Sequence, residues 1–300
     1  MTLAAANGLV VAAHGRHCMV EADDGSRRLC HSRGKKSLCV VGDRVHWQAS
    51  GDEGVIDKLA ERRNLLFRQD EWRSKSFAAN LDQLMVLVGT EPMHAEQQLA
   101  RAMIAAESAG IPALIVLNKI DLPGLAVARE RLASYVAMGV TVLEMALKTD
   151  GAAALALIAP CLADKATLVL GPSGAGKSTL INRVVPGAQA QIGEISAALN
   201  AGRHTTTTTT WYWLDEARHS ALIDSPGFQE FGLHQLQPSE LARYMPDLRA
   251  HAQACKFHNC SHLHEPGCGV RQALDKGEIS PSRYRVYQAL HAELSAPPRW

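Results

Sequence analysis

The sequence predicts a multidomain α/β protein with an N-terminal β-barrel, a central α/β domain and a C-terminal helical domain that binds a metal. Three observations carry this prediction. Short β segments broken by glycine fill residues 1–68, apolar runs alternate with helical stretches over 81–235, and cysteines and a histidine cluster within 236–300. Residues 69–80 are polar and typical of a linker. A chain of 300 residues, 47% of them hydrophobic, is long enough for more than one core.

Five short apolar segments separated by turn residues predict the barrel. They cover residues 8–13, 17–22, 38–41, 44–48 and 55–59, and glycines mark the turns between them. So many strands in so short a stretch indicate a small barrel, and the OB-fold is the commonest barrel of that size.

Six apolar runs in the central part predict the strands of one sheet, at residues 84–88, 114–118, 140–145, 167–170, 211–214 and 221–223. Segments 95–109 and 127–137 between them have a helix-forming composition. Strands that alternate with helices favour a mostly parallel sheet covered by helices. After residue 236 the pattern changes to short helices, with too few apolar residues for a separate core.

Bulk composition excludes some classes of protein. The net charge of +1 identifies no charged partner. The N-terminus lacks the positive start of a signal peptide, and the most apolar segment, residues 151–163, is too short to span a bilayer. Three of the seven cysteines crowd into residues 255–268, which favours a metal over disulfides. We therefore expect a cytoplasmic protein without membrane contact.

Residues 171–178 match the phosphate-binding P-loop pattern, and they stand between a predicted strand and a predicted helix, as this motif requires. Glycines let backbone N–H groups converge on phosphate oxygens, and the helix directs its positive end at the same anion. Lys177 is expected to reach the β- and γ-phosphates, and Ser178 to ligate Mg²⁺. The alternative is an ordinary glycine-rich turn. The motif consists of Gly171, Pro172, Ser173, Gly174, Ala175, Gly176, Lys177 and Ser178.

A second phosphate-site motif, Asp224-Ser-Pro-Gly227, follows the apolar run 221–223. A carboxylate at the end of a strand beside a P-loop can hold Mg²⁺ through water. The Gly227 N–H can contact the γ-phosphate. Without the P-loop, the same tetrapeptide would only indicate a common turn.

The tetrapeptide Asn118-Lys119-Ile120-Asp121 follows a predicted strand and indicates a site for guanine. The Asp121 carboxylate can accept hydrogen bonds from the guanine ring N1–H and 2-amino group. Adenine has neither donor, so a site built on these bonds rejects it. Asn118 would brace the loop, and the stem of Lys119 would lie against the base.

This base motif precedes the P-loop, whereas in ordinary GTPases it follows. Both can occupy one pocket if the sheet is unchanged and the chain enters it elsewhere, because domain termini usually lie close together. We expect such a circular permutation. The segment after 224–227, which senses the γ-phosphate in GTPases, then leads into the C-terminal region. Nucleotide state is therefore expected to be transmitted to that region.

Residues 202–206 lie where a switch loop supplies a threonine to Mg²⁺ and the γ-phosphate. Thr206 is our first assignment and Thr205 the second, and a disordered threonine-rich loop is the alternative. Phe228 stands where many GTPases have a water-orienting glutamine, which predicts slow intrinsic hydrolysis. His204 is the nearest candidate to orient water, unless it is a plain surface histidine and a partner or another group does so.

Cys255, Cys260, His262 and Cys268 offer three thiolates and an imidazole within a short segment. Four such ligands close a tetrahedral shell, which predicts one structural zinc ion without an open position for catalysis. His258 and His264 also lie within reach, and reduced structural cysteines are the competing interpretation. The other cysteines, Cys18, Cys30, Cys39 and Cys161, stand apart and are interpreted as packing residues.

Taken together in this order, the motifs resemble the ribosome small-subunit-dependent GTPase family of the RsgA type over essentially the whole chain. The resemblance rests on residues 118–121, 171–179, 202–206, 224–227 and the zinc-ligand spacing. Residues 42–45 and 78–83 match as well. The P-loop match extends the nucleotide site to Thr179.

The resemblance implies an OB-fold domain, a circularly permuted GTPase domain and a zinc-binding domain. It implies binding to the small ribosomal subunit and its rRNA late in maturation, with GTP hydrolysis stimulated by the subunit. It also places the zinc on Cys255, Cys260, His262 and Cys268. One departure concerns the second base-contacting loop, which usually centres on a serine. Residues 145–147 are Met-Ala-Leu here, so backbone N–H groups would have to contact the guanine O6.

The residues themselves support RNA binding less strongly. Arg16, His17, Arg33, Lys35 and Lys36 fall in predicted loops or strand ends of the barrel, and aromatic residues are scarce. We expect recognition of RNA backbone and shape by a monomeric protein, with a solvated basic loop as the alternative. The sequence leaves two alternatives: a P-loop ATPase or kinase, which residues 118–121 argue against, and a non-enzymatic zinc- and RNA-binding adaptor with a structural nucleotide.

Overall fold

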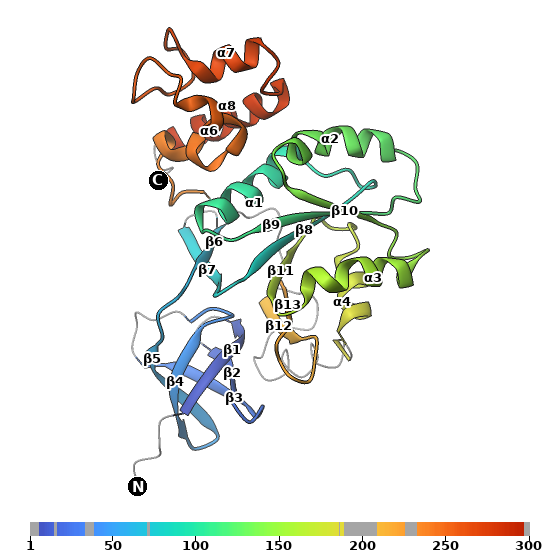
Figure 1. The fold of residues 1–300 in the computed structure, drawn as a ribbon. Helices are drawn as coiled ribbons and strands as arrows, with labels where there is room; N and C mark the ends of the chain where they lie inside the picture. The colour runs from blue at the N-terminus through green and yellow to red at the C-terminus, as the bar shows by residue number, and fades with distance from the viewer. Residues whose placement is uncertain are drawn as a thin grey trace.

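The computed structural model describes residues 6–14, 17–33, 39–70, 73–185, 187–188, 209–225 and 233–296. A β-barrel, a central α/β domain and a C-terminal group of helices follow one another along the chain (Figure 1). The expected fold class is confirmed. No helix within the described ranges is long and apolar enough to cross a membrane.

The barrel has five strands: β1 (Ala6–His14), β2 (His17–Ala22), β3 (Arg27–Ser32), β4 (Arg44–Ser50) and β5 (Glu53–Leu59). They pair in the order β1-β2-β3-β5-β4, with β3 and β5 parallel, and the pairing of β1 with β4 closes the barrel. Val10, Val20 and Ile56 fill its core together with Cys18, Cys30 and Cys39. The packing role expected for these three cysteines is confirmed.

One barrel strand was predicted in the wrong place. Leu38 lies outside the described residues, and from Cys39 to Val41 the chain makes only an isolated bridge between Val41 and Ala78. The third strand is instead β3, in which Cys30 alone is fully buried. The sequence of β3 is mostly polar, so it lacks the alternation of apolar and polar residues that predicts a strand.

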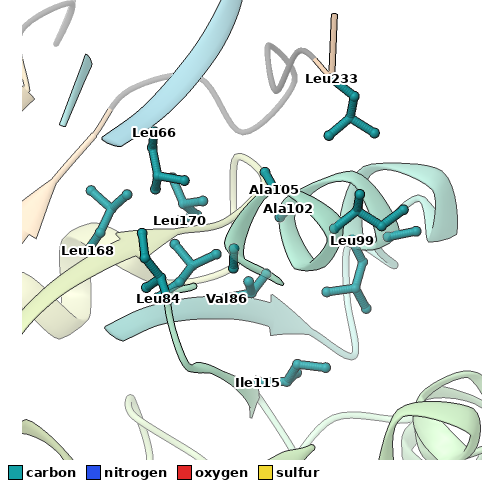
Figure 2. Close-up of a cluster of buried hydrophobic side chains, with 14 of the residues drawn as sticks. Leu66, Leu84, Val86, Leu99, Ala102, Ala105, Ile115, Leu168, Leu170 and Leu233 are labelled. Carbon is teal, nitrogen blue, oxygen red and sulfur yellow. The ribbon is translucent and has the colours of Figure 1, made fainter. Parts of the chain in front are cut away.

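The segment expected as a linker contains part of a β-hairpin, formed by β6 (Leu65–Asp70) and β7 (Arg73–Ala79). Leu66 of this hairpin is buried in the same apolar cluster as Leu84 of the central sheet (Figure 2). Phe77 of the hairpin belongs to that cluster as well. The end of the hairpin is also hydrogen-bonded to the barrel. The Ala79 N–H donates to the Val41 carbonyl at 2.9 Å, and the Asn80 side-chain amide donates to the Gly42 carbonyl at 2.8 Å.

The central sheet has the order β10-β9-β8-β11-β13-β12, and all of its pairings are parallel except that of β12 with β13. All six strands expected there are present. They are β8 (Gln83–Gly89), β9 (Ala113–Asn118), β10 (Thr141–Met145), β11 (Ala166–Leu170), β12 (Thr209–Trp213) and β13 (Ala221–Asp224).

Helices cover both faces of this sheet (Figure 1). The helices α1 (Glu96–Ser108) and α2 (Leu125–Ala137) share an apolar cluster with Leu84 and Val86 of β8. Met85 and Leu87 point the other way, because side chains alternate along a strand, and they share a second cluster with α3 (Gly151–Leu162) and α4 (Lys177–Val184).

The C-terminal part contains η2 (Pro238–Tyr244), α6 (Pro246–Ala252), α7 (Gly269–Asp275) and α8 (Pro281–Ser295). An ion pair and a hydrogen bond attach it to the central domain. The buried Arg283 of α8 pairs with Asp247 of α6 at 2.7 Å within the C-terminal part, and it also donates to the Tyr135 hydroxyl of α2 at 3.1 Å. Arg101 of α1 pairs with Glu293 of α8.

The barrel and the central sheet are joined by hydrogen-bonded strands. Ala12 and Ala13 of β1 are in antiparallel register with Thr210 and Thr209 of β12, so the two domains share one continuous eleven-stranded sheet. The sequence did not predict this junction, because nothing in the composition of an edge strand says which other edge it will meet.

Candidate nucleotide site and metal centre

The predicted P-loop, residues 171–176, leads from the end of β11 into the first turn of α4. Gly174 and Gly176 have φ values of +80° and +108°, in the left-handed region that favours glycine. A Cβ on Gly176 would lie 2.3 Å from the Asn118 side-chain nitrogen, and a Cβ on Gly171 would lie 2.3 Å from the Leu87 carbonyl oxygen. Glycine is therefore favoured at 174 and 176 by the backbone conformation of the turn, and at 171 and 176 because a side chain would collide with neighbouring atoms.

Asn118, the last residue of β9, joins the predicted base loop to the P-loop. Its Nδ2 donates to the Ala175 carbonyl at 2.8 Å, and its Oδ1 accepts from the Leu147 N–H at 3.0 Å. The side chain is buried. The side-chain amide of Asn118 thus connects the base loop to the P-loop, although the two residues are 57 positions apart in the sequence. The order of these two loops along the chain is the reverse of that in ordinary GTPases.

The rest of the predicted base motif follows the end of β9. Lys119 has a φ of +65°, its carbonyl accepts from the Thr90 hydroxyl at 2.6 Å, and its Nζ donates to the Glu91 carbonyl at 2.7 Å. Ile120 N–H donates to the Met145 carbonyl at 3.3 Å. The loop is held on both sides, while the Asp121 side chain is exposed to solvent.

The cation and the carboxylate of the predicted phosphate site lie together. The Nζ of Lys177, at the start of α4, donates to the Asp224 carboxylate at the end of β13. Asp224 is buried, whereas Ser178 and Thr179 on the first turn of α4 are exposed. This places a phosphate-binding cation, a buried carboxylate and exposed hydroxyls at the same edge of the sheet.

Several predicted site residues lie outside the described part of the chain. They are Gly227 of the second phosphate motif, the switch candidates His204, Thr205 and Thr206, and Phe228. Of the cationic residues expected to face RNA, Arg16, Lys35 and Lys36 also lie outside it, while His17 and Arg33 are exposed at strand ends of the barrel.

The predicted metal ligands converge. The ligand atoms of Cys255, Cys260, His262 and Cys268 all lie within 4.8 Å of one another. The Cys255 and Cys268 sulfurs are 3.9 Å apart, and they lie 3.4 and 3.6 Å from His262 Nδ1. A tetrahedral zinc with ordinary bond lengths needs separations of about 3.8 Å between sulfurs and about 3.5 Å between sulfur and nitrogen. The four residues fit such an ion.

The surroundings of the cluster suit a metal as well. The Gly269 N–H points at the Cys255 sulfur at 3.3 Å, and the Arg271 N–H points at the Cys268 sulfur at 3.4 Å. Such donors stabilise thiolates in an outer shell. Burial raises the pKa of the Cys260 thiol and lowers the pKa of His262. The neutral imidazole is the form that binds metal, and a divalent cation would supply the charge that the thiolates need.

A cavity of about 960 Å³ lies elsewhere, between α2 and the C-terminal helices. Its lining includes Glu130, Arg131 and Asp247 and contains no residue of the three nucleotide motifs at 118–121, 171–179 and 224–227. We assign it no part in nucleotide binding.

Comparisons with known proteins agree with this geometry. A family model described as RsgA GTPase matches residues 59–234. A relative from Variovorax paradoxus (strain S110), named small ribosomal subunit biogenesis GTPase RsgA, is 60% identical over 294 residues, covering 96% of this chain and 92% of its own length. A relative of the same name from Burkholderia pseudomallei (strain K96243) is 53% identical, covering 97% and 93%.

Two solved structures share the fold over nearly the whole chain. The crystal structure of YjeQ from Thermotoga maritima superposes with a TM-score of 0.75 at 29% identity, covering 98% of this chain and all of that one. The structure of YloQ, described as a circularly permuted GTPase, superposes with a TM-score of 0.71 at 26% identity, covering 99% and 98%.

Proposed function

Because this chain belongs to the RsgA GTPase family and is a GTP hydrolase, we propose that it acts on the small ribosomal subunit. In this proposal it binds the subunit and its rRNA, assists late maturation, and hydrolyses GTP to GDP and phosphate with stimulation by the subunit. The observation that supports the nucleotide assignment is the hydrogen bond of Asn118 to the Ala175 carbonyl, which joins the two loops.

Guanine would be held by the loop after β9. The exposed carboxylate of Asp121 would accept from the ring N1–H and the 2-amino group, and the stem of Lys119, fixed at its tip by the Glu91 carbonyl, would lie against the base. The Leu147 N–H already donates to Asn118. A backbone contact to the guanine O6 would therefore come from a neighbouring N–H, such as that of Ala146 or Lys148.

The phosphates would be held by residues 171–179, with Lys177 as the cation for the β- and γ-phosphates. Mg²⁺ would be held by Ser178 and Thr206, and by Asp224 through water. Bound Mg²⁺ would neutralise charge on the phosphates as the γ-phosphate leaves. The ion pair between Lys177 and the buried Asp224 supports these assignments, because it places the cation and the carboxylate at the same edge of the sheet.

The residue at position 228 supports the proposed stimulation by the subunit. Phe228 cannot hydrogen-bond water, so another group must orient the attacking water. His204 or the bound rRNA would do so, and the free protein would hydrolyse GTP slowly.

We propose four functional parts: an RNA-binding barrel (residues 1–68), a connection (69–80), a circularly permuted GTPase domain (81–235) and a zinc-binding domain (236–300). The zinc would be structural, since Cys255, Cys260, His262 and Cys268 complete its coordination. We further propose that the protein works as a monomer in the cytoplasm, where ribosomes assemble.

GTP turnover with and without purified small subunits tests the function. The subunits should raise turnover by the wild-type protein, and rising salt should weaken the effect steeply if the contact is to RNA backbone. Lys177→Ala should abolish the stimulated turnover, while the exposed Lys276→Ala should keep it. Equal turnover with and without subunits would contradict the proposal. A Lys177→Ala protein that retains full cellular function would instead favour an adaptor with a structural nucleotide.

A further inference from the structure

A short turn at the end of β8, residues 90–92, contacts both loops of the candidate nucleotide site. In the central sheet β8 lies between β9 and β11, which lead into the base loop and the P-loop, and the three strands are parallel (Figure 1). The Glu91 carbonyl of the turn accepts from the Lys119 Nζ at 2.7 Å. A Cβ placed on Gly174 of the P-loop would lie 3.1 Å from Pro92 Cδ. The turn is therefore in a position to influence how the base loop is held.

Thr90, the first residue of this turn, donates hydrogen bonds to two successive carbonyls of the base motif. Its N–H donates to the Asn118 carbonyl at 3.2 Å, and its hydroxyl donates to the Lys119 carbonyl at 2.6 Å. Only 1% of the surface of Thr90 is exposed. Water therefore has little access to this position and cannot easily replace the hydroxyl.

The peptide group between Lys119 and Ile120 is held at both ends. Its carbonyl accepts from the Thr90 hydroxyl, and its N–H donates to the Met145 carbonyl at 3.3 Å. Lys119 itself has a φ of +65°, in the left-handed region that residues with a side chain seldom adopt. The two hydrogen bonds fix the backbone in this conformation, because a different φ would turn the peptide group away from its partners.

Asp121 lies in a turn that is closed on the same carbonyl. The Leu122 N–H donates to the Lys119 carbonyl at 3.0 Å, which closes a turn over residues 119–122. The Asp121 side chain is exposed and makes no hydrogen bond or ion pair with any residue that the structure describes. Its position therefore depends on the backbone of this turn.

We propose that Thr90 is a positioning residue for guanine selection. Its buried hydroxyl fixes the Lys119 carbonyl, and through this carbonyl it fixes the turn that presents Asp121 to the base. The inference rests on the proposed contact between Asp121 and guanine, and it adds a specificity residue from outside the tetrapeptide. A carboxylate that accepts two hydrogen bonds from one base edge needs a fixed orientation, because hydrogen bonds weaken steeply when their alignment is lost.

The affinities of the full-length protein for GDP and IDP test the proposal. The hypoxanthine base of IDP keeps the N1–H of guanine and lacks its 2-amino group, so the ratio of the two affinities reports how well Asp121 engages that group. The ratio also does not depend on the fraction of active protein in a sample. Displacement of a fluorescent GDP analogue measures both affinities. The wild-type protein should prefer GDP by on the order of tenfold, as expected for one hydrogen bond to a charged group.

Three variants make the result specific to the Thr90 hydroxyl. Thr90→Val removes the hydroxyl, keeps the shape of the side chain, and should reduce the preference for GDP to about threefold or less. Thr90→Ser keeps a hydroxyl and should retain the wild-type ratio. Thr141→Val is the matched control, because it makes the same change at an exposed position of β10 and should also retain the ratio.

Urea denaturation of the same proteins separates positioning from stability. A Thr90→Val protein that is less stable than the wild type but keeps its ratio would overturn the proposal, because the hydroxyl would then only stabilise the turn. A ratio as low in Thr90→Ser as in Thr90→Val would overturn it as well. If Thr90→Val does not fold, Thr90→Ala provides the same comparison. Equal binding of GDP and IDP by the wild-type protein would instead contradict the guanine contact of Asp121, and the role of Thr90 would be lost with it.

Discussion

At the scale of single residues, the buried Asn118 connects the loops of the candidate site through two hydrogen bonds, whereas the Asp121 side chain is exposed. Sequence reasoning identified Asn118 as a brace, because an asparagine follows a strand in front of the aspartate. It could not identify the partners, since the Ala175 carbonyl and the Leu147 N–H are backbone groups that any residue would carry. The contacts of a buried amide depend on the packing of three loops, and only the structure gives them.

Asn118→Ala should destabilise the fold, because it leaves a buried carbonyl and a buried N–H without partners. We expect a loss of about 2 to 4 kcal/mol in the free energy of unfolding, from two such groups. Asp121→Ala is the matched comparison and should change stability by less than about 0.5 kcal/mol, because its side chain is exposed. Urea denaturation without nucleotide measures both. Equal stability of the two variants would show that the Asn118 bridge contributes nothing.

At the scale of elements, sequence reasoning succeeded where periodicity was strong. The strands of the central sheet are fully apolar runs between helices, and each was placed within two residues at either end. It failed for β3, whose residues are polar and half-exposed, and it did not foresee the hairpin of β6 and β7. Residues 42–45 and 78–83 matched the family pattern without a visible reason. The structure gives the reason, because these residues lie where the barrel contacts the hairpin. Asp43 is buried against Arg62, and Gly42 packs against the Ala79 carbonyl.

The helices around the metal cluster should depend on their ion. Cys268→Ser should remove one equivalent of bound zinc and unfold residues 246–296, because metal binding supplies on the order of 10 kcal/mol to such small domains. Cys161→Ser, outside the cluster, should keep the zinc. Elemental analysis and limited proteolysis measure the two effects, and GDP binding should persist in both variants. A Cys268→Ser protein with full zinc content and no new cleavage sites would rule out this ligand set.

At the scale of the whole molecule, the three parts share one apolar cluster, and they are also joined by polar contacts that composition did not reveal. The barrel joins the central sheet through β1 and β12, and β12 directly follows the predicted switch segment. The C-terminal helices join α1 and α2 through Glu293 and Arg283. Changes at the nucleotide could therefore reach the barrel as well as the C-terminal region. The sequence argument anticipated only the second route.

Two ion pairs of the C-terminal part should differ in their effect on stability. Asp247→Ala leaves the buried Arg283 without its carboxylate, and we expect a loss of about 3 kcal/mol or more. Glu107→Ala breaks an exposed pair with Arg249 and should cost less than about 1 kcal/mol. Urea denaturation followed by circular dichroism measures both. Similar losses in the two variants would contradict the assignment of Arg283–Asp247 as a buried ion pair within the C-terminal part.

The central claim is that the loops after β9 and β11 form one guanine nucleotide pocket in spite of their reversed order. Competition binding of GTP and XTP to the wild-type protein and to Asp121→Asn tests it most directly. Xanthine has an oxygen where guanine has its 2-amino group, so an asparagine, with one donor and one acceptor, matches it. The wild-type protein should prefer GTP by on the order of 10⁴-fold, and Asp121→Asn should reverse the preference. Unchanged GTP affinity in Asp121→Asn would show that Asp121 does not contact the base and that the two loops do not share a ligand.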